Sequence, residues 1–174
     1  MPTTKGTRPY VNLDYSASTP ALLQVWEVAR QMLHQPSSDR NDIIDEARDI
    51  CRTFFNAPGD EYDVIFTSNA TEALNIAASG FWGSQPGRDE SVMVDLIQTE
   101  DLLKSYNQEK REGNKRIELI TVTGASNVLG IFNNIQEISR IAHKYGARIF
   151  VDAAQLAAHR PVDMSKWGID YLVF

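Results

Sequence analysis

Residues 148–155, which read Arg-Ile-Phe-Val-Asp-Ala-Ala-Gln, join a short apolar run to a carboxylate and an amide. The three apolar residues Ile149 to Val151 predict a strand buried on both faces of a parallel sheet. Asp152 ends this run, and Gln155 follows after two small residues. Ligands of open α/β sheets bind beyond the carboxyl ends of the strands, where chemistry is usually done, so both side chains are candidate site residues. The alternative is that Asp152 only caps the following structure, since Asp is a good N-cap.

A second apolar run, Val64 to Phe66, leads directly into the polar turn Thr67 to Thr71 and then into a predicted helix. Such a junction leaves backbone N–H groups and the positive end of the helix facing outward, which suits a phosphate group. The alternative is a capping box, in which Ser68 or Asn69 caps the helix and Glu72 reaches back. The two interpretations are compatible with each other.

A third predicted strand, Arg116 to Val122, ends in a small polar loop that contains Asn127. Three strand ends therefore carry an anion site, an amide and a carboxylate, which together suit a phosphorylated heteroaromatic cofactor. Pyridoxal phosphate fits this description, because a carboxylate that keeps its pyridine nitrogen protonated strengthens the ring as an electron sink.

Strands and helices alternate around these turns, which predicts an α/β fold with a mostly parallel sheet and helices on both faces. The predicted strands are 11–14, 64–66, 91–94, 116–122, 149–151 and 171–174. The predicted helices are 20–34, 41–56, 70–81, 99–111 and 135–145, with Thr19 as the cap of the first helix and Gly146 as the C-terminal glycine of the last. Residues 1–10 are expected to form a polar N-terminal arm, and residues 11–174 one α/β domain.

The composition is that of an ordinary soluble protein of 174 residues with a net charge of −6. This charge, and the lack of a lysine or arginine cluster, argue against binding to nucleic acids or anionic membranes. The N-terminus lacks the apolar core of a signal peptide, and no stretch is long enough to span a bilayer. A single cysteine, Cys51, fits a reducing compartment, so we expect a cytoplasmic protein. We predict no metal site.

Four segments of the chain, in the same order, resemble the large-domain motifs of the class V aminotransferases, in particular the cysteine desulfurases and selenocysteine lyases. They are Leu13 to Pro20, Thr67 to Asn75, Ser126 to Gly130, and Val151 to Gln155. The resemblance extends from Val11 to Phe174. It implies the large domain of a fold type I pyridoxal-phosphate enzyme.

The resemblance also assigns roles to five residues. Ala70 and Thr71 would hold the cofactor phosphate, Asn127 and Gln155 would lie near the ring oxygen, and Asp152 would pair with the pyridine nitrogen. It implies a homodimer that acts on an amino acid, by cysteine desulfuration or by transamination.

Two features depart from the family pattern. The family has a histidine that stacks on the cofactor ring, but this sequence has no histidine between His34 and His143. The family lysine that binds the cofactor covalently follows the strand matched by Tyr171 to Phe174, and this sequence ends before it. None of the six lysines matches that position: Lys5, Lys104, Lys110, Lys115, Lys144 and Lys166.

We therefore expect an incomplete cofactor-binding domain that is not catalytically competent by itself and whose exposed apolar strand edge associates with other chains. One alternative is a non-catalytic remnant, a binding or interaction module that keeps the fold. Another is a plain nucleotide-binding α/β domain, which is disfavoured because no Gly-x-Gly-x-x-Gly or Gly-x-x-x-x-Gly-Lys motif occurs.

Overall fold

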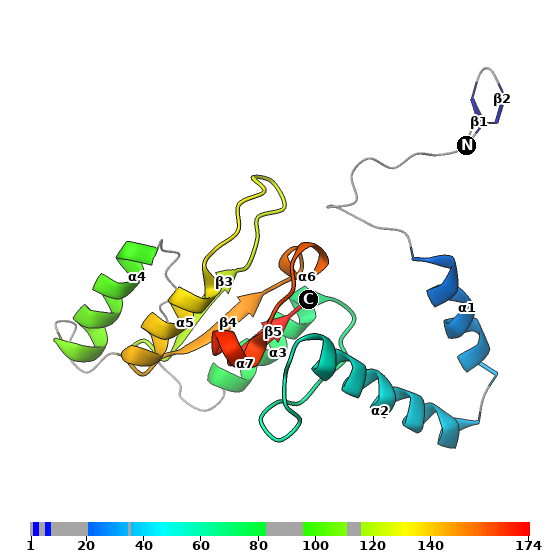
Figure 1. Cartoon of the computed structure of the whole chain (residues 1–174), viewed down its shortest axis with the longest axis horizontal. Helices are drawn as coiled ribbons and strands as arrows, with labels where there is room; N and C mark the ends of the chain where they lie inside the picture. The colour runs from blue at the N-terminus through cyan, green and yellow to red at the C-terminus, as the bar shows by residue number, and fades with distance from the viewer. Residues whose placement is uncertain (1, 4–5, 8–20, 35, 83–95, 111–115) are drawn as a thin grey trace. The chain divides into compact units, whose positions relative to one another are not determined.

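The computed structural model describes the chain except for residues 1, 4–5, 8–20, 35, 83–95 and 111–115 (Figure 1). The predicted strands 11–14 and 91–94 and the Thr19 cap lie outside the described residues. The chain forms two compact units, Met1–Ile43 and Ile44–Phe174, and each is described by itself.

The first unit contains two short antiparallel strands, β1 (Pro2–Thr3) and β2 (Gly6–Thr7), within the segment predicted as a polar arm. Helix α1 (Leu23–Met32) follows, shorter than the predicted helix at both ends, and α2 (Ser37–Phe54) begins in this unit. No residue of α1 is buried, and Glu27 and Arg30 form an exposed ion pair one turn apart on it.

The second unit is built on three parallel strands in the order β3-β4-β5. These strands are β3 (Leu119–Thr123), β4 (Arg148–Asp152) and β5 (Tyr171–Val173). The central strand is the predicted apolar run, and both Ile149 and Val151 are 0% exposed. The predicted α/β class and the parallel sheet are therefore confirmed.

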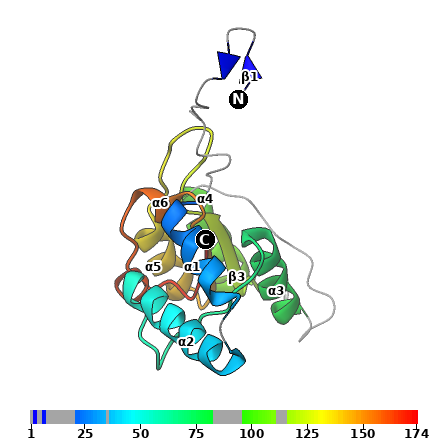
Figure 2. The ribbon, with the colours of Figure 1, turned by 90° about the vertical axis from the view of Figure 1, so that its right-hand side faces the viewer.

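Helices α3 (Ala70–Trp82) and α5 (Ile135–Lys144) lie on opposite sides of the sheet (Figure 2). Helix α5 packs against β4 because its apolar residues recur at helical spacing on one face. The buried apolar residues of α5 are Ile135, Ile138, Ile141 and Ala142. Gly146, with φ of 72°, follows this helix in the left-handed conformation that a C-terminal glycine provides.

Helix α4 (Leu96–Leu103) continues into the π-helix η1 (Lys104–Gln108). The two elements together cover most of the predicted polar helix. Asn107 fixes η1 to the sheet side of the unit. Its Nδ2 donates to the carbonyls of Ile117 and Tyr145, at 2.8 and 3.0 Å, and its Oδ1 accepts from the Ile117 N–H. Two one-turn helices, α6 (Leu156–His159) and α7 (Met164–Trp167), complete the unit.

The predicted strand Val64 to Phe66 is absent from the described sheet, so that part of the prediction is wrong. The Val64 N–H donates to the Asp63 carboxylate, and the Val64 carbonyl accepts from the Arg48 guanidinium at 3.2 Å. Side chains therefore take both backbone groups that a neighbouring strand would use. Ile65 and Phe66 are 70% and 53% exposed, respectively.

None of the helices in the described part of the chain combines the length and apolar character needed to cross a membrane.

Candidate functional site

The carboxyl ends of the three strands are tied together by short backbone hydrogen bonds. The Gly124 N–H donates to the Asp152 carbonyl at 2.7 Å, and the Ala153 N–H donates to the Val173 carbonyl at 2.7 Å. The parallel register places Thr123 beside Asp152 and Asp152 beside Val173. Asp152 thus stands at the end of the central strand, on an edge that is held in place from both sides.

Asp152 orders the turn after β4 and does not cap a helix. Its Oδ1 accepts from the Ala154 N–H at 3.0 Å, a hydrogen bond that spans two residues. Helix α6 begins only at Leu156, and the residue at its N-cap is Gln155, without a side-chain cap. The second carboxylate oxygen of Asp152 has no hydrogen-bond partner among the described residues. The site therefore contains a half-buried, oriented carboxylate with one oxygen available to a ligand.

The loop after β3, which contains Asn127, projects beyond the end of that strand (Figure 1). The loop closes on itself through an antiparallel bridge between Ala125 and Phe132, and the Ser126 N–H donates to the Ile131 carbonyl at 2.9 Å. The side chain of Asn127 is exposed at the turn. Its amide group is thus free to meet a ligand at this edge, but the protein does not orient it.

Two residues that the sequence did not single out hold this loop at its base. Asn133 donates from Nδ2 to the Thr123 carbonyl at 2.8 Å, and its N–H donates to the Gly124 carbonyl. The Arg160 guanidinium carbon lies 3.7 Å from the centroid of the Phe132 ring, a cation–π contact that joins the loop to the segment after α6. An asparagine just before a predicted helix was the only available signal for Asn133, and none pointed to Arg160.

The turn before α3 forms the predicted capping box. Asn69 is the cap, since its Oδ1 accepts from the Glu72 N–H at 2.9 Å, and Glu72 Oε2 accepts from the Ser68 N–H at 2.7 Å. The hydrogen bonds from the backbone and side chain of Ser68 lower the pKa of Glu72. The N–H groups of Ala70 and Thr71 donate to no protein acceptor in the described part of the chain, so they remain available to an anion.

A shallow groove of about 670 Å³ lies along this face of α3. It is lined mainly by small polar side chains: Ser68, Asn69, Thr71, Glu72, Asn75, Ile76 and Ser79. The groove gives an oxyanion access to the start of the helix. The carboxylate of Glu72 is also part of its wall and opposes a negative ligand.

The five predicted residues fall into two groups. Asn127, Asp152 and Gln155 follow the carboxyl ends of the neighbouring strands β3 and β4, whereas Ala70 and Thr71 begin a helix that contacts β5. That all five meet a single ligand stays a prediction.

The lysines that the structure describes stand away from Asp152. Lys144 ends α5 just before β4, so it is near the amino end of that strand, and Lys166 lies in α7. Lys104 and Lys110 belong to η1 and the segment after it. Within the described ranges, no group of three or more histidine, cysteine, aspartate or glutamate side chains could hold a metal ion.

Comparison with protein families gives a match to the model described as "Aminotransferase class-V", over residues 11–100 and 94–174. A probable cysteine desulfurase of Borreliella burgdorferi is 31% identical over 156 residues, which cover 75% of this chain and 37% of that protein. A probable cysteine desulfurase of Methanothermobacter thermautotrophicus is 28% identical, over 96% of this chain and 49% of that protein.

Solved structures show the same similarity. A NifS-like protein from Rickettsia africae matches with a TM-score of 0.75 and 25% identity, over 92% of this chain and 52% of that one. The cysteine desulfurase CsdA from Escherichia coli has the same fold, with a TM-score of 0.69 and 20% identity, over 92% of this chain and 49% of that one. The chain thus spans about half the length, or less, of these relatives.

Proposed function

Because the chain belongs to the class V aminotransferase family, we propose that it contributes the pyridoxal-phosphate site of a cysteine desulfurase-like enzyme. The relatives described above as cysteine desulfurases support cysteine as the substrate, with transamination of another amino acid as the alternative reaction. When bound, the cofactor supplies an electron sink for negative charge that develops on the amino acid.

The observation that carries this proposal is the Asp152 carboxylate at the end of the central strand. One oxygen is held by the Ala154 N–H, which fixes the direction of the side chain, and the other oxygen has no protein partner in the described residues. A carboxylate of this kind can accept a hydrogen bond from a protonated ring nitrogen and hold the proton there. Asp152 is the residue to which we assign this role.

The remaining residues fit the other polar groups of the cofactor. The backbone N–H groups of Ala70 and Thr71 are donors for the phosphate, and the Asn127 and Gln155 amides are donors for the ring oxygen. Glu72 weakens the phosphate site through its negative charge, although its bond to Ser68 directs one oxygen into the turn. We therefore expect non-covalent binding by this chain to be weak.

The test is a titration of the purified chain with pyridoxal phosphate, followed by absorbance and by the thermal stability of the chain. We expect saturable binding that Asp152→Asn weakens about tenfold, as for the loss of one charge-assisted hydrogen bond. Asp60→Asn is the matched control, because Asp60 is an exposed loop carboxylate. Equal binding by both variants would remove Asp152 from the site.

A second candidate is a binding module of the same fold without catalysis. The position of the lysines favours it, since none of the described lysines lies at the carboxyl end of a strand as Asp152 does, and Lys144 lies just before the start of β4. A covalent bond to the cofactor requires a lysine amine aimed at its aldehyde carbon. Borohydride reduction of the chain with pyridoxal phosphate, followed by mass spectrometry, separates the two candidates. A stoichiometric adduct at one lysine, with turnover of cysteine, would exclude the binding module.

A further inference from the structure

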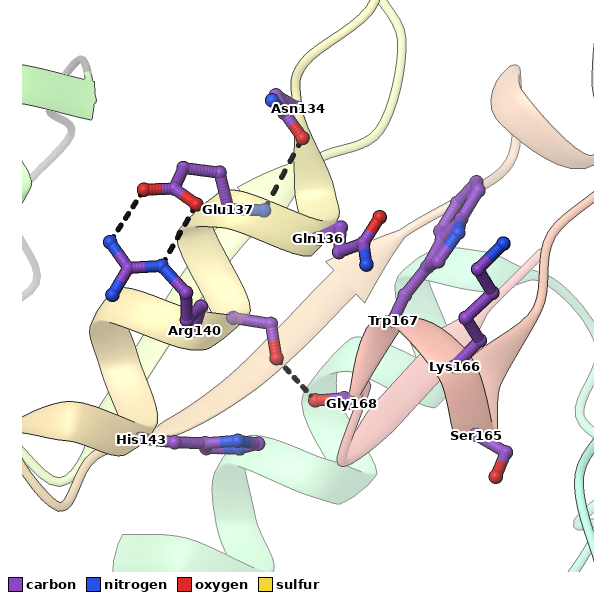
Figure 3. A pocket seen from close by; sticks show the side chains of 10 residues that line it. Asn134, Gln136, Glu137, Arg140, His143, Ser165, Lys166, Trp167 and Gly168 are labelled. Carbon is purple, nitrogen blue, oxygen red and sulfur yellow. Dashed lines mark hydrogen bonds and ion pairs between the residues drawn. The ribbon is translucent and has the colours of Figure 1, made fainter.

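A polar groove of about 380 Å³ lies between α5 and α7 (Figure 3). We call it the α5–α7 groove. Its lining residues come from the two helices and the turn after α7: Asn134, Gln136, Glu137, Ser139, Arg140, His143, Ser165, Lys166, Trp167 and Gly168. Asp152, Asn127 and Gln155 are not among the residues that line it.

The floor of the groove is closely packed. The buried Ser139 hydroxyl donates to the Gly168 carbonyl at 2.5 Å, which joins α5 to the turn after α7. Gly168 has φ of 64°, and a Cβ atom there would lie 2.9 Å from Ser139 Oγ. His143 lies at one end of the floor, where Asp170 Oδ2 holds its Nε2 at 2.9 Å and also accepts from the Ile149 N–H. The two walls are therefore fixed relative to each other.

The carboxylates around the groove already have hydrogen-bond or ion-pair partners. Both oxygens of Glu137 bind the Arg140 guanidinium, at 2.6 and 2.9 Å. Asp163 Oδ1 accepts from the Lys166 N–H and from Asn56 Nδ2, both at 2.8 Å, and these bonds lower the pKa of its carboxyl group. The negative charge at the rim is thus largely satisfied by neighbouring donors.

The other cation of the groove is the Lys166 ammonium. Among the described residues, no carboxylate lies within ion-pair distance of its Nζ, and Asp163 attracts it only at longer range. Figure 3 shows Lys166 beside the indole of Trp167 on α7, with the amide of Gln136 projecting from α5 on the other side of that ring. The groove therefore combines a positive charge, an aromatic face and an amide within a cavity of small-molecule size.

We propose that the α5–α7 groove binds a small aromatic ligand that carries one oxyanion, a carboxylate or a phosphate. The oxyanion lies at Lys166, where it replaces water on an unpaired ammonium, and the ring packs against Trp167. The assignment is independent of the proposed function, since none of the five residues proposed to hold pyridoxal phosphate lines the groove.

The test follows the indole N–H signal of Trp167 by NMR in the full chain, with the signal assigned from Trp167→Phe. The probes are phenyl phosphate, benzoate, inorganic phosphate and benzyl alcohol. Phenyl phosphate and benzoate should shift the signal saturably, and inorganic phosphate and benzyl alcohol should each bind about tenfold more weakly, because each lacks one of the two recognised groups.

Three variants decide whether the groove is responsible. Lys166→Gln should weaken both aromatic anions about tenfold, while Lys166→Arg retains binding. Lys104→Gln, which removes the same charge from η1, is the matched control and should bind as the unmodified chain does. An unmoved Trp167 signal with both anions, or equal binding by Lys166→Gln, would overturn the proposal.

Discussion

Gly130 and Gly168 share a left-handed backbone conformation, with φ of 65° and 64°, but their surroundings differ. A Cβ atom at Gly130 would meet nothing within 4 Å, whereas one at Gly168 would lie only 2.9 Å from Ser139 Oγ. Gly130 therefore requires glycine for its backbone alone, and Gly168 requires it for its backbone and for the packing beneath the α5–α7 groove.

We predict that Gly168→Ala lowers the free energy of unfolding more than Gly130→Ala. Both variants carry the backbone cost of about 1–2 kcal/mol, and Gly168→Ala adds a further cost of about 1–3 kcal/mol for overpacking. Urea unfolding of the two variants measures the difference, and Gly130→Ala is the matched control. Equal losses of unfolding free energy in the two variants would show that Ser139 moves away from the added methyl group without cost.

Residue-level predictions from the sequence succeeded where local chemistry decides the outcome. The spacing of Asn69 and Glu72 was enough to predict the capping box, because both bonds form within one turn. The sequence left open whether Asp152 caps a helix, and the structure answers this through the bond to the Ala154 N–H. Arg160 was missed, because its contact with Phe132 joins segments 28 residues apart.

At the scale of elements, the start of α3 should depend on pH. The hydrogen bonds from Ser68 lower the pKa of Glu72 in the folded chain, so they stabilise the ionised form. This stabilisation is present above the unfolded pKa of a glutamate, about 4.3, and is lost as the pH falls through the lowered folded value. We predict that the Ser68 amide NMR signal shifts over this acidic range.

The control for this pH dependence is Glu72→Gln, which keeps the shape of the side chain but removes its titration. The Ser68 transition should disappear in that variant and persist in Glu61→Gln, because Glu61 is an exposed loop carboxylate. A Ser68 transition that survives in Glu72→Gln would have to come from another carboxylate.

The sequence predicted the long elements well and the short ones poorly. Helix α5 and strand β4 carry their own periodicity and burial, so their bounds could be predicted closely. Helices α6 and α7 have four residues each, which is too short for a periodic pattern. The Val64 to Phe66 run satisfied the strand pattern, but a strand also needs a partner, and side chains bind the Val64 backbone instead.

At the scale of the whole molecule, the second unit leaves several large apolar side chains at its surface. At least 49% of each of the following is exposed: Ile65, Phe66, Ile76, Val128, Leu129, Ile131 and Phe174. The relatives are about twice as long as this chain, or longer, and in proteins of that size additional structure can cover such surface. Among them, Val128, Leu129 and Ile131 belong to one loop, and an exposed cluster of apolar side chains marks an interaction site in soluble proteins.

We predict that the chain by itself self-associates and that the loop tip of Val128 and Leu129, at 81% and 71% exposure, contributes to the contact. Sedimentation velocity over a concentration series measures this. Val128→Ser with Leu129→Ser should weaken association tenfold or more, since burial of each side chain contributes about 1.5–3 kcal/mol. The matched control, Asn75→Ser with Gln108→Ser, changes exposed polar residues only and should associate unchanged. A chain that stays monomeric at every concentration would contradict the prediction, and equal association by both double variants would place the contact elsewhere.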